Sequence, residues 1–504
     1  MALRSSLFAV TVALLVASPA ALAGPPKPQR DRGAASIGGP ATAENPFNVV
    51  GLTKEVVDNL RTIAKRDPAR NAQVFMKIGD SITSGGGSDG ALGCFAAAEK
   101  QVIDLAGRDE LKPTIAYFDQ VKMASGGRSA NKVATSSWNR DSFAAVVSVD
   151  SSWPMRPNDA YDKATAIDKE LSDLRGTPPR FAIYMLGSND IGSSPGLRHG
   201  HAGDVLKYFA DKVLAAVELL SSRGIIPVLT YIPPIPGRSE QSLWYSPAAA
   251  AVLRGIATAK RLPSIDAYSE MEDLGIAASK TFKSGKPQPG PGYWDDIHTA
   301  APPRAECSFT APHLQYGRNL RGLRTLEVLD KLRRVFADNV AFVDPPPPAI
   351  AGKGTVRAPF EVPTVPFAYA TPTSGPEAGH LKDYTSCGGL DTPLDGDETV
   401  FRLDIASEIS LRALAIPGDC PDSTCSKGQE MAVALFKNSV EPKNCVSAGI
   451  MVQRKFSPGT YYLVLDSPRS RQPKTGVLSV HRCMEPDEDC AKCSATDAAC
   501  VSPP

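Results

Sequence analysis

The chain has 504 residues, of which 42% are hydrophobic and 22% are charged. That composition is typical of a soluble globular protein with enough apolar material for a sizeable core. The 55 Lys and Arg residues balance 54 Asp and Glu residues, so charge gives no reason to expect nucleic acid or an anionic membrane as a partner. At roughly 100–200 residues per domain, the length suggests two to four domains.

The beginning of the chain predicts export. A basic start, an apolar run over 7–17 and the small residues Ala21 and Ala23 form the pattern of a cleaved signal peptide over residues 1–23. The apolar run is short for a bilayer span, which disfavours an uncleaved anchor, and no later run is long enough for a membrane helix. Residues 24–45 predict a flexible lead-in. We expect a secreted protein, periplasmic or extracellular.

Residues 46–340 show the alternation of strand-like and helical stretches that is typical of an α/β domain. Short apolar runs predict the strands of a parallel sheet, and stretches with apolar residues at helical spacing predict the helices that cover it. The expected strands are 73–78, 116–123, 181–186 and 225–231, and the expected helices include 204–220 and a strongly amphipathic closing helix at 320–336.

The character of the sequence changes after the α/β region. A proline run lies within 341–357 and predicts a linker, because proline resists both helix and sheet. Residues 358–484 contain short strand-like runs separated by Gly, Pro, Asp and Ser, which predicts a smaller all-β sandwich. Residues 485–504 form a Cys-rich tail. The expected strands of the sandwich include 400–403, 409–416, 431–435 and 460–466.

Ten cysteines agree with export to an oxidising compartment. Cys94 and Cys307 lie in the α/β region and the other eight lie near the end, so we expect one disulfide in the first group and four in the second. Eight cysteines allow 105 pairings. Cys490 and Cys493 also have the spacing of zinc ligands, but an exported chain without a clear four-ligand pattern favours disulfides. The eight late cysteines are Cys387, Cys420, Cys425, Cys445, Cys483, Cys490, Cys493 and Cys500.

A serine directly follows the first expected strand, in the block 79–83 (GDSIT). Open α/β sheets bind their ligands at the carboxyl ends of the strands, and Gly79 permits a tight turn into a helix. The turn would present Ser81 at a helix start, where backbone N–H groups stabilise negative charge. The alternative interpretation is that Asp80 or Ser81 only caps the helix.

Two further blocks offer donors for an oxyanion. Asn189, in the block 187–190 (GSND), follows a buried strand, and its side-chain amide can donate to negative charge that develops there. An ordinary turn is the alternative. Gly126 follows the second expected strand, where its backbone N–H can approach a substrate closely. Its alternative is a simple loop.

A histidine late in the α/β region can serve as the base. Asp295 lies three residues before His298, so its carboxylate can hold the imidazole at Nδ1 and leave Nε2 to accept the serine proton. His313 is a competitor, because it is followed by a glycine and the closing helix. We favour His298, because His313 has Thr310 where the aspartate should be.

These four blocks, in this order, resemble the SGNH hydrolases, also called GDSL-type esterases and lipases. The resemblance covers about 46–340 and implies a flavodoxin-like three-layer α/β/α fold, with no metal or other cofactor. It also implies Ser81 as nucleophile, His298 as base and Asp295 as the carboxylate that orients the base. The implied oxyanion donors are the N–H of Ser81, the N–H of Gly126 and the side chain of Asn189.

The sequence departs from the family pattern at one block, because Gly126 lacks the usual preceding Asn. Gly127 is therefore an alternative donor. The stretch 299–310 is expected to be a loop beside the active site. Cys307 lies in this loop and Cys94 lies just past the nucleophile turn, so we expect a disulfide between them that ties the loop to the catalytic end of the sheet.

The expected activity is hydrolysis of carboxylic esters through an acyl-enzyme. The substrate is a lipid, a small ester or an acetylated polysaccharide, the last as a carbohydrate esterase. Residues 458–466 (PGTYYLVLD) make the β region resemble the pre-peptidase C-terminal modules of secreted bacterial enzymes, which would allow contact with a surface or polymer. The rival of another class is a non-catalytic binding protein on a hydrolase scaffold. A structural envelope protein would leave the four blocks unexplained.

Overall fold

The fold is described from a computed structural model of the chain. The predicted signal peptide, the lead-in and the Cys-rich tail lie outside the residues that the structure describes. Those residues are 47, 49–84, 92–123, 126, 135–192, 202–235, 240–273, 298–299, 301–302, 305–373, 381, 387, 394–417, 431–449 and 451–482.

Four parallel strands form the sheet of the first domain, in the order β1-β2-β3-β4. Every residue of these strands is buried except the first three of β1, as expected of a parallel sheet covered on both faces. In the register, Gly79 pairs with Met185 and Tyr231 with Asp266. The carboxyl ends of the strands therefore meet at one edge of the sheet. The strands are β1 (Asn71–Gly79), β2 (Pro179–Met185), β3 (Ile226–Tyr231) and β4 (Ser264–Asp266).

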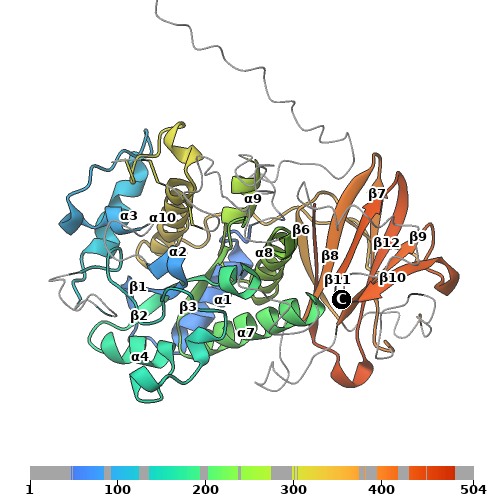
Figure 1. The fold of residues 1–504 in the computed structure, drawn as a ribbon, viewed down its shortest axis with the longest axis horizontal. Coiled ribbons are helices and arrows are strands. Elements are labelled where there is room, and N and C mark those ends of the chain that lie inside the picture. The colour runs from blue at the N-terminus through green and yellow to red at the C-terminus, as the bar shows by residue number, and fades with distance from the viewer. Residues whose placement is uncertain are drawn as a thin grey trace, which may run out of the picture.

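Helices cover both faces of this sheet (Figure 1). The rings of Phe75 and Phe181 point to one face, where they contact Phe118 of α3 and Phe336 of α10. Tyr231 points to the opposite face, where Arg254 of α8 lies over its ring. The helices are α1 (Lys54–Lys65), α2 (Ser81–Ser84), α3 (Lys112–Asp119), α4 (Ala166–Asp173), α5 (Ser188–Gly192), α7 (Ala202–Ser222), α8 (Glu240–Lys260), α9 (Ala267–Asp273) and α10 (Gly317–Phe336).

One expected strand is wrong. The first half of the stretch 116–123 falls in helix α3, which ends at Asp119 and buries Thr114 and Phe118 one turn apart. The apolar residues of this stretch have both strand-like and helix-like spacing, and the proline at the start of α3 fits a first helical turn. Among the described residues, Ala145 forms a parallel bridge with Gly79 at the edge of β1 that β2 leaves open.

The closing helix α10 also differs from the expected amphipathic pattern. It begins at Gly317 and buries polar as well as apolar side chains, among them Asn319, Arg321 and Thr325. Helix α10 packs on α3, on β4 and on the short turn that contains His313. Its polar residues therefore form specific contacts inside the domain, and Arg321 contacts helix α2.

The second domain consists of two sheets packed face to face, in the orders β10-β9-β12-β7-β5 and β11-β8-β13-β6. A buried apolar cluster joins them, with Phe401 and Leu463 from the first sheet and Leu411 and Val480 from the second. All pairings are antiparallel except β5 with β7. The strands are β5 (Phe360–Glu361), β6 (Phe367–Pro372), β7 (Thr399–Ile405), β8 (Ile409–Pro417), β9 (Ala432–Lys437), β10 (Cys445–Gly449), β11 (Met451–Phe456), β12 (Gly459–Asp466) and β13 (Thr475–Arg482).

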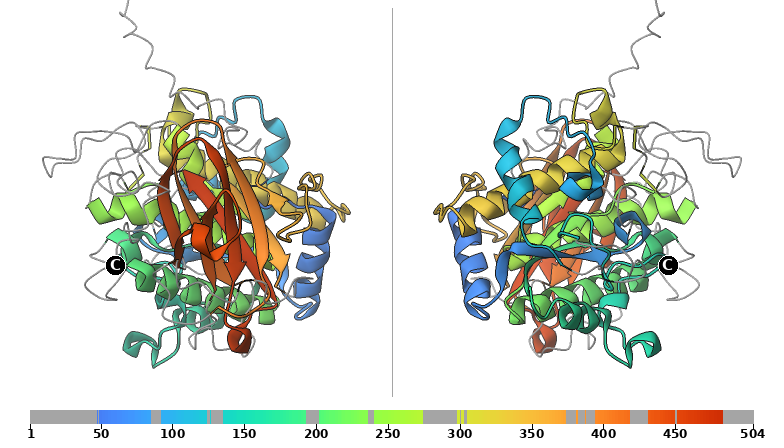
Figure 2. Two further views of the ribbon diagram at one scale, coloured as in Figure 1. Left: turned by 90° about the vertical axis from the view of Figure 1, so that its right-hand side faces the viewer. Right: turned by 90° about the vertical axis from the view of Figure 1, so that its left-hand side faces the viewer.

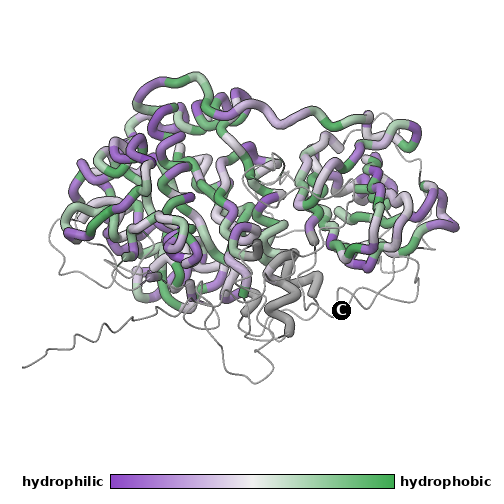
Figure 3. The backbone as a smooth tube through the Cα atoms, turned by 90° about the horizontal axis from the view of Figure 1, so that it is seen from above, coloured by the Kyte–Doolittle hydropathy of each residue, from purple (hydrophilic) through white to green (hydrophobic). Residues whose placement is uncertain are grey.

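One of the two domains lies in front of the other when the molecule is seen from either end (Figure 2), and the two lie side by side when seen from above (Figure 3). Helix α8 packs against β6, β8 and β13 of the second domain as well as against β3 of the first. Gly255 of α8 allows this close approach, because a Cβ there would lie 2.4 Å from Cδ1 of Ile416. The side chains of Leu414, Ile416 and Val477 belong to the same buried cluster as the core of the first domain.

Candidate active site

Ser81 is the first residue of α2, directly beyond the end of β1. The carbonyl of Asp80 accepts from the N–H groups of Thr83 and Ser84, at 3.0 and 2.8 Å. The Asp80 carboxylate accepts from the N–H of Ile82 at 3.0 Å. The residue before Ser81 therefore caps the helix, which presents the Ser81 hydroxyl at the carboxyl edge of the sheet.

Gly79 makes this turn possible. A Cβ at this position would lie 2.5 Å from Cβ of Thr83 and 2.9 Å from the carbonyl oxygen of Met185. Any side chain would push α2 away from β1 or β1 away from β2. Gly79 is thus required by packing.

His298 lies beside the serine. The distance from His298 Nε2 to Ser81 Oγ is 2.8 Å, and both side chains are half-buried. This is the contact that a nucleophile and its general base require. Asp295, the expected partner of His298, lies outside the described residues.

Asn189 sits in α5, directly after β2. Its Nδ2 donates to the carbonyl of Val149 at 2.9 Å. That bond fixes the orientation of the amide, which has a second N–H for another acceptor. The preceding Gly187 has a φ of +133°, a backbone conformation that side chains rarely adopt.

Asp190 binds the same segment, residues 149–151, that Asn189 contacts. The carboxylate of Asp190 accepts from both the N–H and the hydroxyl of Ser151. Burial raises the pKa of Asp190 to about 7, although the bond from the Ser151 hydroxyl acts in the opposite direction. Asn189 and Asp190 thus hold the segment 149–151 from two sides. Sequence reasoning missed this segment, because no motif marks it.

Gly126 is among the residues that the structure describes, whereas Gly127 and most other neighbours in the chain lie outside them. A Cβ at Gly126 would lie 2.4 Å from Nη2 of Arg140 and 2.7 Å from the carbonyl oxygen of Asp141. The guanidinium of Arg140 is buried and forms ion pairs with Glu170 and Asp173. Gly126 therefore packs against a fixed charged group, where only glycine fits.

His313 has a different partner. Its Nδ1 lies 2.7 Å from the hydroxyl of Ser308, which in turn donates to the carboxylate of Asp104 at 3.3 Å. A disulfide joins Cys94 to Cys307 next to this group, with 5.8 Å between the Cα atoms. His313 thus lies in a group with Ser308, Asp104 and the disulfide, whereas His298 contacts Ser81.

The structure adds two charged groups that sequence motifs did not single out as functional. Arg321 of α10 is buried beneath α2, and Asp80 is fully buried beside Ser81. Burial raises the pKa of Asp80 to about 6, although the hydrogen bond from the N–H of Ile82 and the positive charge of Arg321 both act to lower it. Burial lowers the pKa of Arg321 to about 10, although the negative charge of Asp80 acts to raise it.

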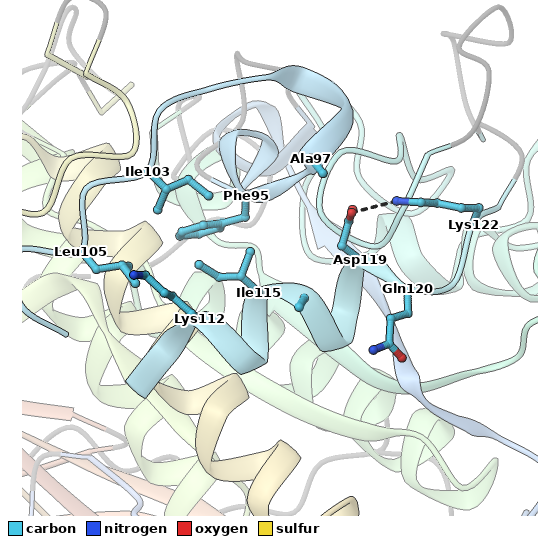
Figure 4. Close-up of a pocket in the computed structure, with 10 residues that line it drawn as sticks. Phe95, Ala97, Ile103, Leu105, Lys112, Ile115, Asp119, Gln120 and Lys122 are labelled. Carbon is cyan, nitrogen blue, oxygen red and sulfur yellow. Dashed lines mark hydrogen bonds and ion pairs between the residues drawn. The ribbon is translucent and has the colours of Figure 1, made fainter. Parts of the chain in front are cut away.

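A separate groove of about 490 Å³ lies between α3 and the segment that contains Phe95 and Ile103 (Figure 4). Its walls are mainly apolar, with Phe95, Ile103 and Ile115 facing the space, and Asp119 and Lys122 form an ion pair at its rim. None of the predicted site residues lines this groove, so it is distinct from the site at Ser81.

The chain is similar to known proteins at the level of solved structures. No family model matches the sequence, and no curated protein matches it. Among solved structures, a GDSL-like lipase from Bacteroides thetaiotaomicron is 13% identical, with a TM-score of 0.29, over 55% of this chain and 98% of that one. A catalytic mutant of an acetylxylan esterase from Geobacillus stearothermophilus is 15% identical, with a TM-score of 0.28, over 52% and 94%.

The second domain has its own match among solved structures. The pre-peptidase C-terminal domain of a collagenase from Bacillus anthracis is 16% identical, with a TM-score of 0.15, over 22% of this chain and 86% of that one. At TM-scores this low, the likenesses carry no conclusion about function, which has to come from the residues of this chain. Among the helices of the described residues, none combines the length and the apolar character needed to cross a membrane.

Proposed function

We propose that the protein is a secreted serine esterase of the GDSL type, which hydrolyses carboxylic esters through an acyl-enzyme. The observation that carries this proposal is the 2.8 Å contact between Ser81 Oγ and His298 Nε2 at the carboxyl edge of the sheet. In this proposal the first domain is a flavodoxin-like three-layer hydrolase, and the second is a disulfide-rich sandwich. The disulfides Cys94–Cys307 and Cys387–Cys445 are compatible with secretion.

The proposed reaction starts with attack of Ser81 Oγ on the ester carbonyl carbon. His298 Nε2 takes the serine proton as the C–O bond forms, and then gives it to the departing alcohol. Water attacks the acyl-enzyme, and His298 takes its proton in turn. The carboxylate of Asp295 is proposed to stabilise the imidazolium that forms at each step.

The negative oxygen of the tetrahedral intermediate needs fixed donors. We assign this role to the N–H of Ser81 at the start of α2, the N–H of Gly126 and the side-chain amide of Asn189. The bond from Asn189 to Val149 supports the assignment, because it orients the amide before substrate binds. The close packing of Gly126 on Arg140 supports a fixed backbone at the second donor.

The direct test is hydrolysis of nitrophenyl esters from acetyl to long acyl by the wild type and by Ser81→Ala, His298→Ala and His313→Ala. The first two variants should lose activity by a factor on the order of 10³ or more. His313→Ala is the matched control, because His313 contacts Ser308 and not the serine nucleophile. Activity that persists in Ser81→Ala would overturn the proposal.

The acyl chain-length profile from the same series identifies the substrate class. A preference for acetyl esters would favour the carbohydrate acetyl esterase, to be followed with acetylated polysaccharide. A preference for long chains would favour a lipase. A wild-type protein inactive on every ester, nitrophenyl and polysaccharide, would leave the binding-protein alternative in place.

A further inference from the structure

Arg321, a buried residue of the closing helix α10, contacts helix α2, which begins at Ser81. Nη1 of Arg321 donates to the carbonyl of Ile82 at 2.8 Å, and Nη2 donates to the hydroxyl of Thr83 at 2.9 Å. The Arg321 residue is only 2% exposed. Both acceptors lie in α2, in the two residues that follow Ser81. A guanidinium carries its donors in a rigid plane, so two bonds fix both the position and the rotation of this short helix.

Helix α2 depends on such contacts, because it has only four residues and a helix of that length is not stable alone. At its start it is held by Gly79 and the Asp80 cap. Arg321 holds it further along and from beneath. A loss of this contact would let α2 tilt, and the Ser81 hydroxyl would move relative to His298.

The same guanidinium faces a buried negative charge. The Asp80 carboxylate is 0% exposed, and its Oδ2 has no hydrogen-bond partner among the described residues. The charged groups that act on it are Arg321 from α10 and His298, with the Ser188 hydroxyl of α5 also close. The positive charge of Arg318, one turn before Arg321 in α10, acts to lower the pKa of the Arg321 guanidinium. Asp80 is thus a described carboxylate that can attract a His298 imidazolium.

We propose that Arg321 is a positioning residue of this hydrolase, an inference that rests on the proposed function. It holds α2 so that the Ser81 hydroxyl stays within reach of His298. Its positive charge keeps the neighbouring Asp80 carboxylate ionised, and this carboxylate stabilises the imidazolium that forms when His298 takes the serine proton.

The test compares Arg321→Lys and Arg321→Met with the matched control Arg180→Met, in assays of kcat, KM and the pH profile. Arg180 is also a buried arginine that donates to main-chain carbonyls, including those of Ala64 and Gly224, but at the amino end of β2. Folded fraction is measured for each variant by circular dichroism, so that kcat refers to folded protein.

Arg321→Met should lower kcat by a factor on the order of 10², since a displacement of about 1 Å is enough for such a loss. KM should change little. Arg321→Lys should recover part of the loss, because an ammonium keeps the charge but not the planar pair of donors. Arg180→Met should lower stability and leave kcat per folded molecule unchanged. A normal kcat in folded Arg321→Met would overturn the positioning role.

The pH profile tests the electrostatic part. Loss of Arg321 raises the pKa of Asp80, because the guanidinium favours its ionised form. The acid limb of kcat/KM should therefore move to higher pH in Arg321→Met and stay in place in Arg180→Met. The shift should vanish when Asp80→Asn is added. A shift that persists in this double variant would overturn the role of Asp80.

The same series separates this inference from the proposed function. If the wild type does not hydrolyse any ester while Ser81→Ala behaves identically, the proposed function itself fails and the inference fails with it. If the wild type is active and depends on Ser81 while Arg321→Met matches it in kcat and in pH profile, only the inference is wrong.

Discussion

At the scale of single residues, the site combines a serine at a helix start with a histidine at hydrogen-bond distance. The four sequence blocks predicted this pair, because a nucleophile and a base must come from fixed places in a parallel sheet. The choice between His298 and His313 followed from the mechanism alone, and the structure places His298 next to Ser81. Arg321 could not be predicted in the same way, because its role depends on which side of α10 faces α2.

Asp80 yields a prediction about stability and pH. Its folded pKa of about 6 lies above the ordinary 3.8, so the folded state binds more protons than the unfolded state between these values. Stability is therefore lost as pH rises through this window. At about 1.4 kcal/mol per pH unit, the interval corresponds to roughly 3 kcal/mol at pH 8.

Asp80→Asn should thus raise the free energy of unfolding at pH 8 by up to about 3 kcal/mol while it lowers kcat. Urea unfolding at pH 8 and at pH 3.5 measures this, and the gain should be absent at pH 3.5. Asp58→Asn, at an exposed carboxylate paired with Lys54, is the control and should show no such gain. A destabilised Asp80→Asn at pH 8 would contradict the argument.

At the scale of elements, the segments that carry the proposed nucleophile and the proposed base are tied together. The disulfide joins Cys94, which follows Ser81 in the chain, to Cys307, which lies between His298 and α10. Beside it, the N–H of Asp104 donates to the carbonyl of Cys307 at 2.9 Å and the N–H of Phe309 to the carbonyl of Asp104 at 2.8 Å. The disulfide and these two hydrogen bonds, together called the clasp, tie the segment around Asp104 to the segment around Cys307.

Removal of the clasp should lower catalysis as well as stability. Cys94→Ser/Cys307→Ser should reduce the free energy of unfolding by about 2–4 kcal/mol, and kcat per folded molecule by on the order of tenfold. Cys387→Ser/Cys445→Ser is the matched control, because that disulfide lies in the second domain, and it should leave kcat unchanged. Equal kcat values in the two variants would show that the clasp does not position the site.

The strands and helices also show which parts of the fold sequence patterns can predict. The buried runs of β1, β2 and β3 and the long helix α7 were predicted, because each is a continuous apolar run or a regular helical repeat. The stretch 116–123 was assigned wrongly to a strand, since short apolar segments fit both periods. The bridge from Ala145 to Gly79 could not be expected, because it depends on where a long loop returns to β1.

At the scale of the whole molecule, the second domain is joined to the first by more than a linker. Sequence patterns predicted a sandwich after the proline run, and two sheets packed face to face follow it. They did not predict that α8 would pack on one sheet of each domain. An alanine-rich helix with Gly255 at the contact gives no periodic signal for this role.

This contact gives a prediction. Gly255→Leu should lower the free energy of unfolding of the whole chain by about 1–3 kcal/mol, because the added side chain must displace Ile416 and Val477. Gly176→Leu is the control, since a Cβ there meets nothing within 4 Å. Thermal unfolding of both variants measures the difference. Equal unfolding temperatures would mean that the two domains do not rely on this contact.

The most direct test of the central claim is to label the protein with a fluorophosphonate and locate the adduct by peptide mass mapping. An activated serine reacts readily with this reagent, whereas an ordinary hydroxyl does not. We expect one adduct, on Ser81, which is lost in Ser81→Ala, strongly reduced in His298→Ala and unchanged in His313→Ala. No adduct in the wild type, or an adduct on a different residue, would contradict the assignment of Ser81 and His298 as the catalytic pair.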